Sequence, residues 1–237
     1  MRGNDQPGAK ARAVREMFGR IAPRYDLLNH LLSANIDHRW RRVCAGEVRK
    51  KLAALPARIL DVGCGTGDLA IEFSRFGRVT GCDFSYPMLE IGRRKTREAA
   101  FGNPIDLLAG DGLKLPFRDA SFDAVVSAFV LRNLSDLDNG LREMRRVLRP
   151  GGVLAALEFA MPRAPVLGSL YRLYFGRILP LFGDAVSGVP GAYRYLPTSV
   201  EAFPSPEEIM EIIAGTGFGT VESRPLSAGI VFLYLAQ

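Results

Sequence analysis

Three glycines at alternate positions, directly after a short apolar run, constrain the fold of this chain more than any other feature. The run covers residues 58–62 and leads into the sequence Gly-Cys-Gly-Thr-Gly at 63–67, which Asp68 follows. Glycine has no side chain, so it lets a backbone turn sharply at the end of a strand and approach a ligand closely. A helix that begins after such a turn offers N–H groups without a partner. The sequence therefore predicts a strand, a glycine loop and a helix that together carry a ligand site.

The rest of the chain continues this alternation of strands and helices. Further apolar runs predict strands over 78–82, 105–109, 122–128 and 153–159, with two closing strands near 220–224 and 230–235. Helical spacing covers 68–76, 85–97, 138–148 and 207–214. Ser85 stands where it can cap the second of these helices. Strands and helices that alternate at this length predict an α/β fold with a seven-stranded, mostly parallel, doubly wound sheet.

The predicted elements divide the chain into five segments. Residues 1–13 are polar and are expected to fray, and residues 14–57 form a helical cap that is broken at a proline. Residues 58–160 form the ligand-binding core. A long insertion covers 161–206, and residues 207–237 complete the sheet with a helix and two strands.

The insertion carries an apolar face at helical spacing. The residues that form this face are Leu167, Leu170, Tyr171, Tyr174 and Ile178, and the pattern stops at Pro180. One interpretation is an amphipathic helix that packs on the core, and another is an apolar lid over a hydrophobic substrate. The insertion follows the fifth strand, beside the carboxyl edge where ligands bind in such sheets, and this position supports the lid.

Positive charge is concentrated near the N-terminus. Residues 1–58 hold 13 basic and 5 acidic side chains, a net charge of +8, whereas residues 59–237 hold 18 and 20, a net charge of −2. Such a surface can contact nucleic-acid phosphates or anionic lipid headgroups, or it can stay solvated. The basic cluster expected on the surface comprises Arg39, Arg41, Arg42, Arg49, Lys50 and Lys51.

Composition limits the class of protein further. Apolar residues make up 48% and charged residues 24%, which indicates a globular chain. Cys44, Cys64 and Cys82 form no C-x-x-C pair, so we expect reduced thiols and no metal site. The sequence has no apolar run of about 18 residues that would span a membrane and no apolar core of a signal peptide at its start. We expect a cytoplasmic protein.

Two classes of cofactor use a glycine loop with an acidic residue at the end of the next strand. Asp83 ends the second strand, 16 residues beyond Gly67, where its carboxylate can accept both hydroxyls of a ribose. A dinucleotide is one alternative, since residues 65–70 fit the pattern G-x-G-x-x-G/A. That pattern alone is a weak signal.

S-adenosylmethionine is the alternative that the sequence favours. Asp61 and Asp68 flank the glycines, and such an acidic setting suits a cationic sulfonium ligand that has a carboxylate and no pyrophosphate. Asp111 and Gly112 follow the third strand, where they can meet an adenine. A glycine turn without a ligand is disfavoured, because acidic residues stand at two further strand ends.

Beyond the glycine loop, the chain resembles the menaquinone and ubiquinone biosynthesis C-methyltransferase family from Met17 to the C-terminus. The stretches that carry this resemblance are Tyr25-Asp26-Leu27-Leu28-Asn29 through Ser33 to Trp40, Leu131-Arg132-Asn133, Arg146 to Gly152 with Leu157-Glu158-Phe159, and Tyr193 to Leu196 with Phe203-Pro204. The resemblance implies a Rossmann-like class I methyltransferase that uses S-adenosylmethionine. It implies cofactor contacts at Thr66, Asp83, Asp111 and Gly112. Together with the loop, the expected cofactor-binding set is Asp61, Gly63, Gly65, Thr66, Gly67, Asp83, Asp111 and Gly112.

The chain departs from the family pattern at three positions. Ala128 stands where the family usually has Ser, and the neighbouring Ser127 is expected on the opposite face of its strand. Asp37 stands where the family has His, with His38 one residue late, and Ala160 replaces a Ser. These departures concern the substrate contacts rather than the fold.

The resemblance implies methyl transfer to a ring carbon of a polyprenylated quinol. Demethylmenaquinol is our first choice of substrate, and a benzoquinol of ubiquinone biosynthesis is the alternative. A quinol carbon becomes a good nucleophile when a ring hydroxyl loses its proton, so we expect Arg132 to stabilise the phenolate. Asn133 is expected to hold the second ring oxygen, and Tyr25 to orient the ring or relay a proton. A surface ion pair of Arg132 with an aspartate at 136 or 138 is the structural alternative.

Other classes of function make different predictions. A nucleic-acid methyltransferase would use the basic N-terminal region to bind phosphates. A quinone oxidoreductase with a nicotinamide cofactor would leave Asp111, Gly112 and the Leu-Arg-Asn sequence at 131–133 without a role. The apolar face at 167–178 favours a lipid-like substrate, so we expect no nucleic acid and a peripheral contact with the anionic inner face of the cell membrane. A monomer and a homodimer both stay open. Trp40 is expected to anchor the cap, and His38 is a weaker alternative as the base.

Overall fold

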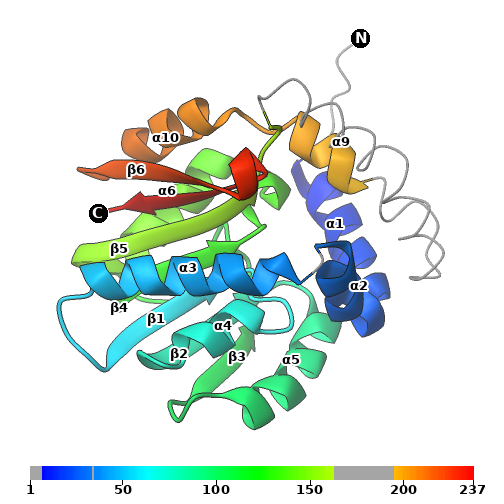
Figure 1. Cartoon of the computed structure of the whole chain (residues 1–237), viewed down its shortest axis with the longest axis horizontal. Helices are drawn as coiled ribbons and strands as arrows, with labels where there is room; N and C mark the ends of the chain where they lie inside the picture. Colours follow the sequence, from blue (N-terminus) through cyan, green and yellow to red (C-terminus); the bar gives the residue numbers. More distant parts are fainter. Residues whose placement is uncertain (1–6, 34, 163–194) are drawn as a thin grey trace.

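A seven-stranded sheet forms the centre of the computed structural model (Figure 1). The structure describes residues 7–33, 35–162 and 195–237. The strands are β1 (Ala57–Val62), β2 (Gly77–Asp83), β3 (Ile105–Ala109), β4 (Phe122–Ala128), β5 (Leu148–Phe159), β6 (Val221–Leu226) and β7 (Val231–Ala236). Their order is β3-β2-β1-β4-β5-β7-β6, and only the two pairings of β7 are antiparallel. The predicted α/β fold is confirmed.

Helices cover both faces of the sheet (Figure 1). The helices in the described ranges are α1 (Pro7–Ile21), α2 (Tyr25–Leu32), α3 (Ile36–Lys51), α4 (Asp68–Phe73), α5 (Tyr86–Ala99), α6 (Leu137–Val147), α9 (Tyr195–Glu201) and α10 (Pro206–Gly215), of which α1, α2 and α9 lie beside the end of the sheet. Short 3₁₀ turns lie at Ala22–Arg24 (η1), Leu131–Asn133 (η2) and Ser227–Gly229 (η5). Within these ranges, no helix is long and apolar enough to cross a bilayer.

The core has two halves because successive side chains of a strand point to opposite faces. In β4, Ala124 and Val126 join the half beneath α3 and α4, whereas Val125 joins the half beneath α6 and α10. In the same way, β5 sends Val153, Ala155 and Leu157 to the first half. Both faces of these central strands are therefore buried, which explains why their sequences are apolar nearly throughout.

Two predicted boundaries differ from the structure by five residues or more. Helix α1 begins at Pro7, so the prediction of a frayed tail over 1–13 is wrong for 7–13, a stretch rich in alanine, the strongest helix former. Strand β5 begins at Leu148 instead of Val153, because Leu148 pairs with Phe122 before the register shifts. The apolar face predicted over 167–178 lies outside the described residues.

Three helix starts show different ways of satisfying the first N–H groups of a helix. Ser205 and Glu208 form a reciprocal capping box at the start of α10. Asp136 caps α6 by accepting a hydrogen bond from the Asn139 N–H at 3.0 Å. Ser85 occupies the N-cap position of α5, as predicted, but its side chain makes no capping bond. Its backbone N–H instead donates to Asp83 Oδ1 at 2.8 Å, which holds the start of the helix in place of the side chain.

Trp40 anchors the cap helix α3 to the sheet, as the sequence predicts. Its ring is 5% exposed and packs edge-on against Phe129 and Phe159, each with centroids 6.0 Å away. Its indole N–H donates to the Ser227 hydroxyl at 2.9 Å. The contact joins the cap to η5, the turn between β6 and β7.

We expect Trp40→Ala to destabilise the protein by about 3–5 kcal/mol, because it empties a packed site and removes the hydrogen bond. Ser227→Ala removes only the hydrogen bond and should cost about 1 kcal/mol. Urea unfolding followed by circular dichroism measures both free energies. Equal effects of the two variants would contradict the assignment of Trp40 to the core.

Candidate functional site

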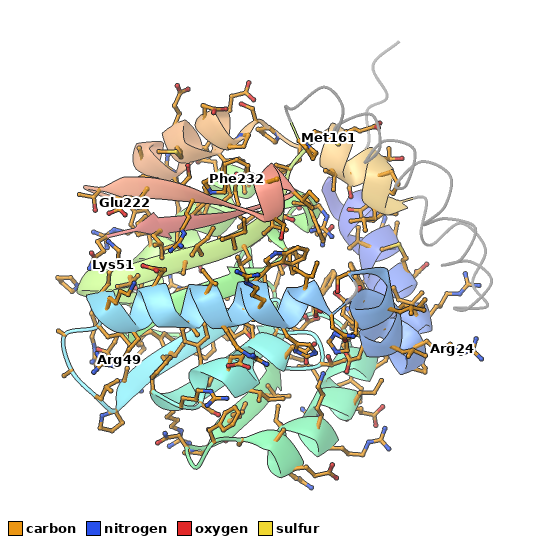
Figure 2. All side chains as sticks on the ribbon, in the orientation of Figure 1. Arg24, Arg49, Lys51, Met161, Glu222 and Phe232 are labelled. Atoms are coloured by element: carbon orange, nitrogen blue, oxygen red, sulfur yellow. The ribbon has the colours of Figure 1, made fainter. Side chains whose placement is uncertain are left out.

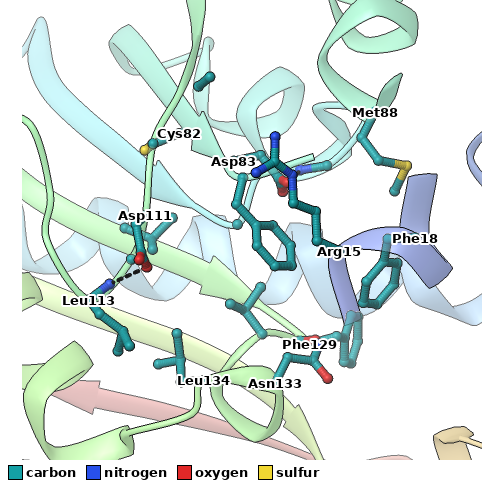
Figure 3. Close-up of a pocket in the computed structure, with 18 of the residues that line it drawn as sticks. Arg15, Phe18, Cys82, Asp83, Met88, Asp111, Leu113, Phe129, Asn133 and Leu134 are labelled. Atoms are coloured by element: carbon teal, nitrogen blue, oxygen red, sulfur yellow. Dashed lines mark hydrogen bonds between the residues drawn. The ribbon is translucent and has the colours of Figure 1, made fainter. Parts of the chain in front are cut away.

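A cavity of about 460 Å³ opens at the carboxyl ends of the central strands, next to the point between β1 and β4 where the strand order reverses (Figure 3). Predicted site residues that border it are Tyr25, Gly63, Gly65, Asp83, Asp111, Gly112 and Asn133. Helix α1 contributes Arg12, Arg15 and Phe18 to the wall, which sequence reasoning missed. Residues predicted as cofactor contacts and as substrate contacts therefore share one cavity.

The glycine loop after β1 takes the sharp course that its sequence predicts. Gly63, Gly65 and Gly67 all have positive φ angles, of 68°, 53° and 89°. A Cβ atom on Gly63 would lie 2.4 Å from a methyl carbon of Val130, which itself borders the cavity. Larger residues at Gly63 are thus excluded by both the backbone angle and the space.

Asp83 fastens the glycine loop to the start of α5. Its Oδ2 accepts a hydrogen bond from the Gly65 N–H at 2.8 Å, and its Oδ1 accepts one from the Ser85 N–H at 2.8 Å. Burial raises the pKa of Asp83, and these backbone N–H groups offset part of that rise. Asp83 borders the cavity, as expected of a residue that accepts ribose hydroxyls.

Asp111 and Gly112 form the next part of the wall, after β3. The Oδ1 atom of Asp111 accepts a hydrogen bond from the Leu113 N–H at 2.9 Å (Figure 3). Gly110 precedes them, and a Cβ atom there would lie 2.5 Å from the Cys82 sulfur, so the chain passes close to β2. The strand ends therefore bring Asp83 and Asp111 to one cavity, as the sequence predicts.

Asp61, Thr66 and Gly67 do not border this cavity. Thr66 is 2% exposed, and its hydroxyl donates to Asp26 Oδ1 at 2.5 Å. Asp61 is 1% exposed, and neither of its carboxylate oxygens has a hydrogen-bond partner among the described residues. Burial raises the pKa of Asp61 well above its usual range, and the nearby Asp83 raises it further. These residues support the loop from behind.

Arg132 does not lie on the surface, so the alternative of an ion pair with residues 136 or 138 is wrong. Its guanidinium pairs with Glu158, which is fully buried at the end of β5, with 2.5 Å between Nη1 and Oε1. The Arg132 backbone N–H also donates to Glu158 Oε2 at 3.2 Å. The sequence shows both residues, but it does not show that the ends of β4 and β5 bring them together.

Arg132 and Asn133 both bind the backbone of Phe129. This residue follows β4 with a φ of 64°, a strained angle for a side chain of this size. Its carbonyl accepts bonds from Arg132 Nη1 at 2.7 Å and from Asn133 Nδ2 at 3.1 Å. Its ring stacks on Phe159 at 4.5 Å and borders the cavity. Arg132 thus fixes the shape of the cavity wall.

Tyr25 and Asn133 both border the cavity. Tyr25 begins α2 and contacts Phe18 edge-on, with centroids 5.8 Å apart. Burial raises the pKa of its hydroxyl, and Asn29 and Arg132 offset part of the rise, so the hydroxyl stays neutral at pH 7. Asn133 Oδ1 accepts a bond from the Tyr195 hydroxyl of α9 at 3.0 Å.

The three departures from the family pattern have different settings. Ala128 borders the cavity, whereas Ser127 is buried and donates to the Val62 carbonyl at 2.9 Å, which confirms that the two side chains point apart. Ala160 is buried, and its N–H donates to the Ile230 carbonyl at 3.0 Å. Asp37 is also buried and bonds to side chains of the cap. Of the three, Ala128 alone contributes to the wall that the described residues form.

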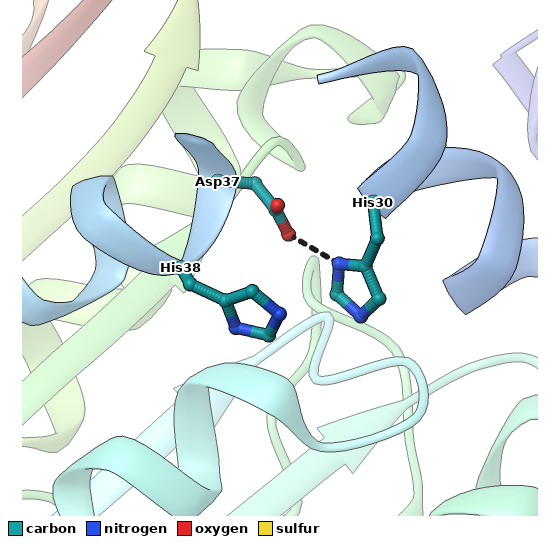
Figure 4. Close-up of side chains that lie close together, drawn as sticks. All are labelled: His30, Asp37 and His38. Carbon is teal, nitrogen blue, oxygen red and sulfur yellow. Dashed lines mark hydrogen bonds and ion pairs between the residues drawn. The ribbon is translucent and has the colours of Figure 1, made fainter. Parts of the chain in front are cut away.

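His30, Asp37 and His38 gather between α2 and α3 (Figure 4). The His30 Nδ1 atom lies 2.8 Å from Asp37 Oδ2, and the two imidazole rings stack at 4.3 Å. Lone pairs of an imidazole lie in the plane of its ring, so two stacked rings cannot both point at one metal ion. Burial opposes ionisation of Asp37, but Arg41, Ser33 and His30 outweigh it and lower its pKa to about 2. The cluster fits a structural ion pair of the cap.

In the basic cluster expected on the surface, one residue is buried and others form ion pairs within the protein. Arg41 is 5% exposed and pairs with Asp37 and Asp68, so its assignment to the surface is wrong. Lys50 pairs with Glu47 at 2.9 Å, and Lys51 with Glu222 of β6 at 3.1 Å (Figure 2). The formal charge of this segment therefore overstates what a partner can contact.

We expect Asp61→Asn to become more stable, relative to the wild type, as the pH rises above about 4. The folded protein binds the Asp61 proton more tightly than the unfolded chain, whose pKa is about 3.9, so wild-type stability falls as pH increases through this range. Asparagine has no proton to lose and avoids this cost.

Urea unfolding at pH 4, 5.5 and 7 measures the difference. Asp106→Asn, at an exposed carboxylate that pairs with Arg78, is the control and should show no such gain. A relative stability of Asp61→Asn that is constant or falls with pH would contradict the burial argument.

Comparison with known proteins identifies the family. The model of the ubiE/COQ5 methyltransferase family matches residues 6–237. A demethylmenaquinone methyltransferase of Deinococcus radiodurans is 48% identical over 231 residues, which cover 96% of this chain and 93% of the relative. One of Thermus thermophilus is also 48% identical and covers 93% of this chain and 99% of the relative. The ubiquinone/menaquinone biosynthesis C-methyltransferase UbiE of Geotalea uraniireducens is 41% identical and covers 96% and 97%.

Solved structures agree on the fold. A SAM-dependent methyltransferase from Aquifex aeolicus superposes with a TM-score of 0.58 at 21% identity, over 81% of this chain and 88% of that one. The CurJ carbon methyltransferase gives a TM-score of 0.60 at 19% identity, over 83% and 53%. At such identities the similarity shows the architecture alone. Together with the family match, it shows that the chain is a Rossmann-like enzyme of the ubiE/COQ5 methyltransferase family.

Proposed function

We propose that this enzyme transfers a methyl group from S-adenosylmethionine to a ring carbon of a polyprenylated quinol. The observation that carries the proposal is the shared cavity, in which Asp83 and Asp111 meet Tyr25 and Asn133. A methyl donor and a ring must lie side by side for this reaction, and one cavity that both sets of residues border satisfies this need.

The residues at the strand ends fit the cofactor. Gly63 and Gly65 provide a close backbone approach, Asp83 offers carboxylate oxygens for a ribose, and Asp111 and Gly112 wall the place for an adenine. S-adenosylmethionine, when bound, supplies an activated methyl group on a sulfonium that leaves readily.

On the substrate side, we assign the ring contacts to Tyr25 and Asn133. A neutral Tyr25 hydroxyl can donate to a ring oxygen or pass its proton on, and Asn133 has a second amide N–H beyond the one that Phe129 accepts. Arg132 supports the reaction from behind the wall. Its positive charge is shared with Glu158, so it acts by holding Phe129 and Asn133 and by biasing the local potential toward a phenolate.

Demethylmenaquinol is the substrate that we propose. Two relatives at 48% identity carry the name demethylmenaquinone methyltransferase, whereas the relative named for both quinones is 41% identical. The prenyl tail needs an apolar surface, and Phe18 and Phe129 offer one in the wall of the cavity.

Single-turnover methylation with labelled S-adenosylmethionine tests the function. We expect label on a demethylmenaquinol and little on a polyprenyl methoxy-benzoquinol, both kept reduced in detergent. Asp83→Ala should bind the cofactor about 100-fold more weakly, because two charge-assisted hydrogen bonds to a ribose are lost, and should give no product with either quinol at low cofactor concentration. Label on the benzoquinol alone would contradict the substrate, and label on neither, despite tight cofactor binding, would contradict the quinol class.

We also propose peripheral contact with an anionic membrane through α2. Leu27 and Leu31, one turn apart, are 60% and 59% exposed, and Ile36 at the start of α3 is 42% exposed. Exposed Arg20 and Arg24 precede them in the chain and suit anionic headgroups. The same helix contributes Tyr25 to the cavity, so contact here would bring a lipid-soluble quinol near its site.

Sedimentation with vesicles measures this contact. We expect binding to vesicles that contain phosphatidylglycerol, with a loss of about tenfold when Leu27 and Leu31 are both changed to Ser. Leu55→Ser is the matched control, since Leu55 is 43% exposed in the loop before β1. Equal binding by the two variants would rule out α2 as the membrane contact.

A further inference from the structure

A chain of alternating charges joins the N-terminal cap to the glycine loop. Its members come from α2, α5, α4 and α3, and they are Asp26, Lys95, Asp68, Arg41 and Asp37. Lys95 Nζ lies 2.6 Å from Asp26 Oδ2 and 2.5 Å from Asp68 Oδ1. Arg41 lies 3.6 Å from Asp68 and pairs with Asp37. The cap therefore touches the loop and its helix through charged groups as well as through apolar packing.

Asp26 is the member that contacts the loop itself. Its Oδ1 accepts the hydrogen bond of the Thr66 hydroxyl at 2.5 Å, while its Oδ2 pairs with Lys95. Lys95 also donates to the Thr66 hydroxyl oxygen at 3.3 Å. One carboxylate thus ties α2 to the loop and to α5 at the same time.

Asp26 lies next to a residue that borders the cavity. Asp26 directly follows Tyr25, so the first turn of α2 places one side chain in the cavity and the next on the loop. Thr66 stands between two glycines whose φ angles are 53° and 89°, so Asp26 contacts the turn of the loop itself. A ligand that restrains the loop therefore also restrains α2.

The Asp26–Lys95 pair is partly shielded from solvent. Asp26 and Lys95 are each about a quarter exposed, at 26% and 25%, so they are shielded from solvent more than fully exposed surface pairs are. Asp68, at 12% exposure, is held by both Lys95 and Arg41 and gives the pair a fixed partner on α4.

We propose that Asp26 is a positioning residue that couples occupation of the glycine loop to closure of the cap over the cavity. The methyl donor orders the loop, Thr66 holds Asp26, and α2 then holds Tyr25 together with the wall that α1 provides. The coupling rests on the proposed use of S-adenosylmethionine, but it needs no particular methyl acceptor. A residue that only stabilised the fold would not transmit the state of the loop to the cap.

Limited proteolysis of the full chain reports the closure directly. Arg12, Arg15, Arg20 and Arg24 are exposed in α1 and η1, so trypsin can cut the cap when it opens. With saturating S-adenosylhomocysteine, we expect cleavage of the wild-type cap to slow by about tenfold, a typical size for coupling between sites. In Asp26→Asn at saturating ligand, most of this protection should disappear, because a neutral amide cannot form an ion pair with Lys95.

Two further variants sharpen the test. Lys95→Gln breaks the same link from α5 and should lose the same protection, and the double variant should lose no more than either single one. Asp138→Asn is the matched control, since it removes a carboxylate from the exposed pair with Arg142 and should keep the full protection.

Quinol binding is not needed for this readout, so a wrong methyl acceptor would leave the result unchanged. Full protection of both Asp26→Asn and Lys95→Gln at saturating ligand would overturn the proposal. An equal loss of protection in Asp138→Asn would overturn it as well, because any lost charge would then have the same effect.

Discussion

The carboxylate of Asp83 is the contact on which the site depends. It lies at the end of β2 and accepts hydrogen bonds from the backbone of the glycine loop and from the start of α5. Parallel strands that run in register bring their carboxyl ends to one edge, so a short acidic side chain there can reach both loops. The two segments that Asp83 holds together, the glycine loop and the start of α5, both line the cavity.

A second set of charged residues holds the elements around the cavity together. Asp26, Lys95, Asp68 and Arg41 join the cap to the loop, and Arg132 with Glu158 braces the opposite wall through the strained residue Phe129. Both sets are shielded from water. An unpaired charge is costly in such a setting, so each pair fixes the elements that carry it. Arg132 and Glu158 thus hold the part of the wall that Phe129 forms, and the Asp26 contacts hold α2 against the glycine loop.

Local sequence was sufficient for the strands, the glycine loop and the two acidic strand ends. Gly63, Asp83 and Asp111 could be predicted because each marks the end of an apolar run, and the fold class fixes where such ends lie. Arg132 could be singled out, but its setting could not, since its partner Glu158 is 26 residues away on the next strand. Arg12 gave no signal, because a polar helix start looks like a frayed tail until the helix packs. Arg15 fell within the predicted cap, but nothing local showed that this part of the helix borders the cavity.

The sequence by itself therefore determined the order of the elements, the class of fold and the positions of Gly63, Asp83 and Asp111 at strand ends beside the cavity, since these depend on short-range patterns and on the geometry of parallel strands. Only the tertiary structure decided that Arg41 and Arg132 are buried in ion pairs, that Ala128 borders the cavity while Asp37 does not, and that Asp26 meets Thr66. The physical reason is that burial and charge pairing depend on residues far apart in the chain, which local patterns do not bring together.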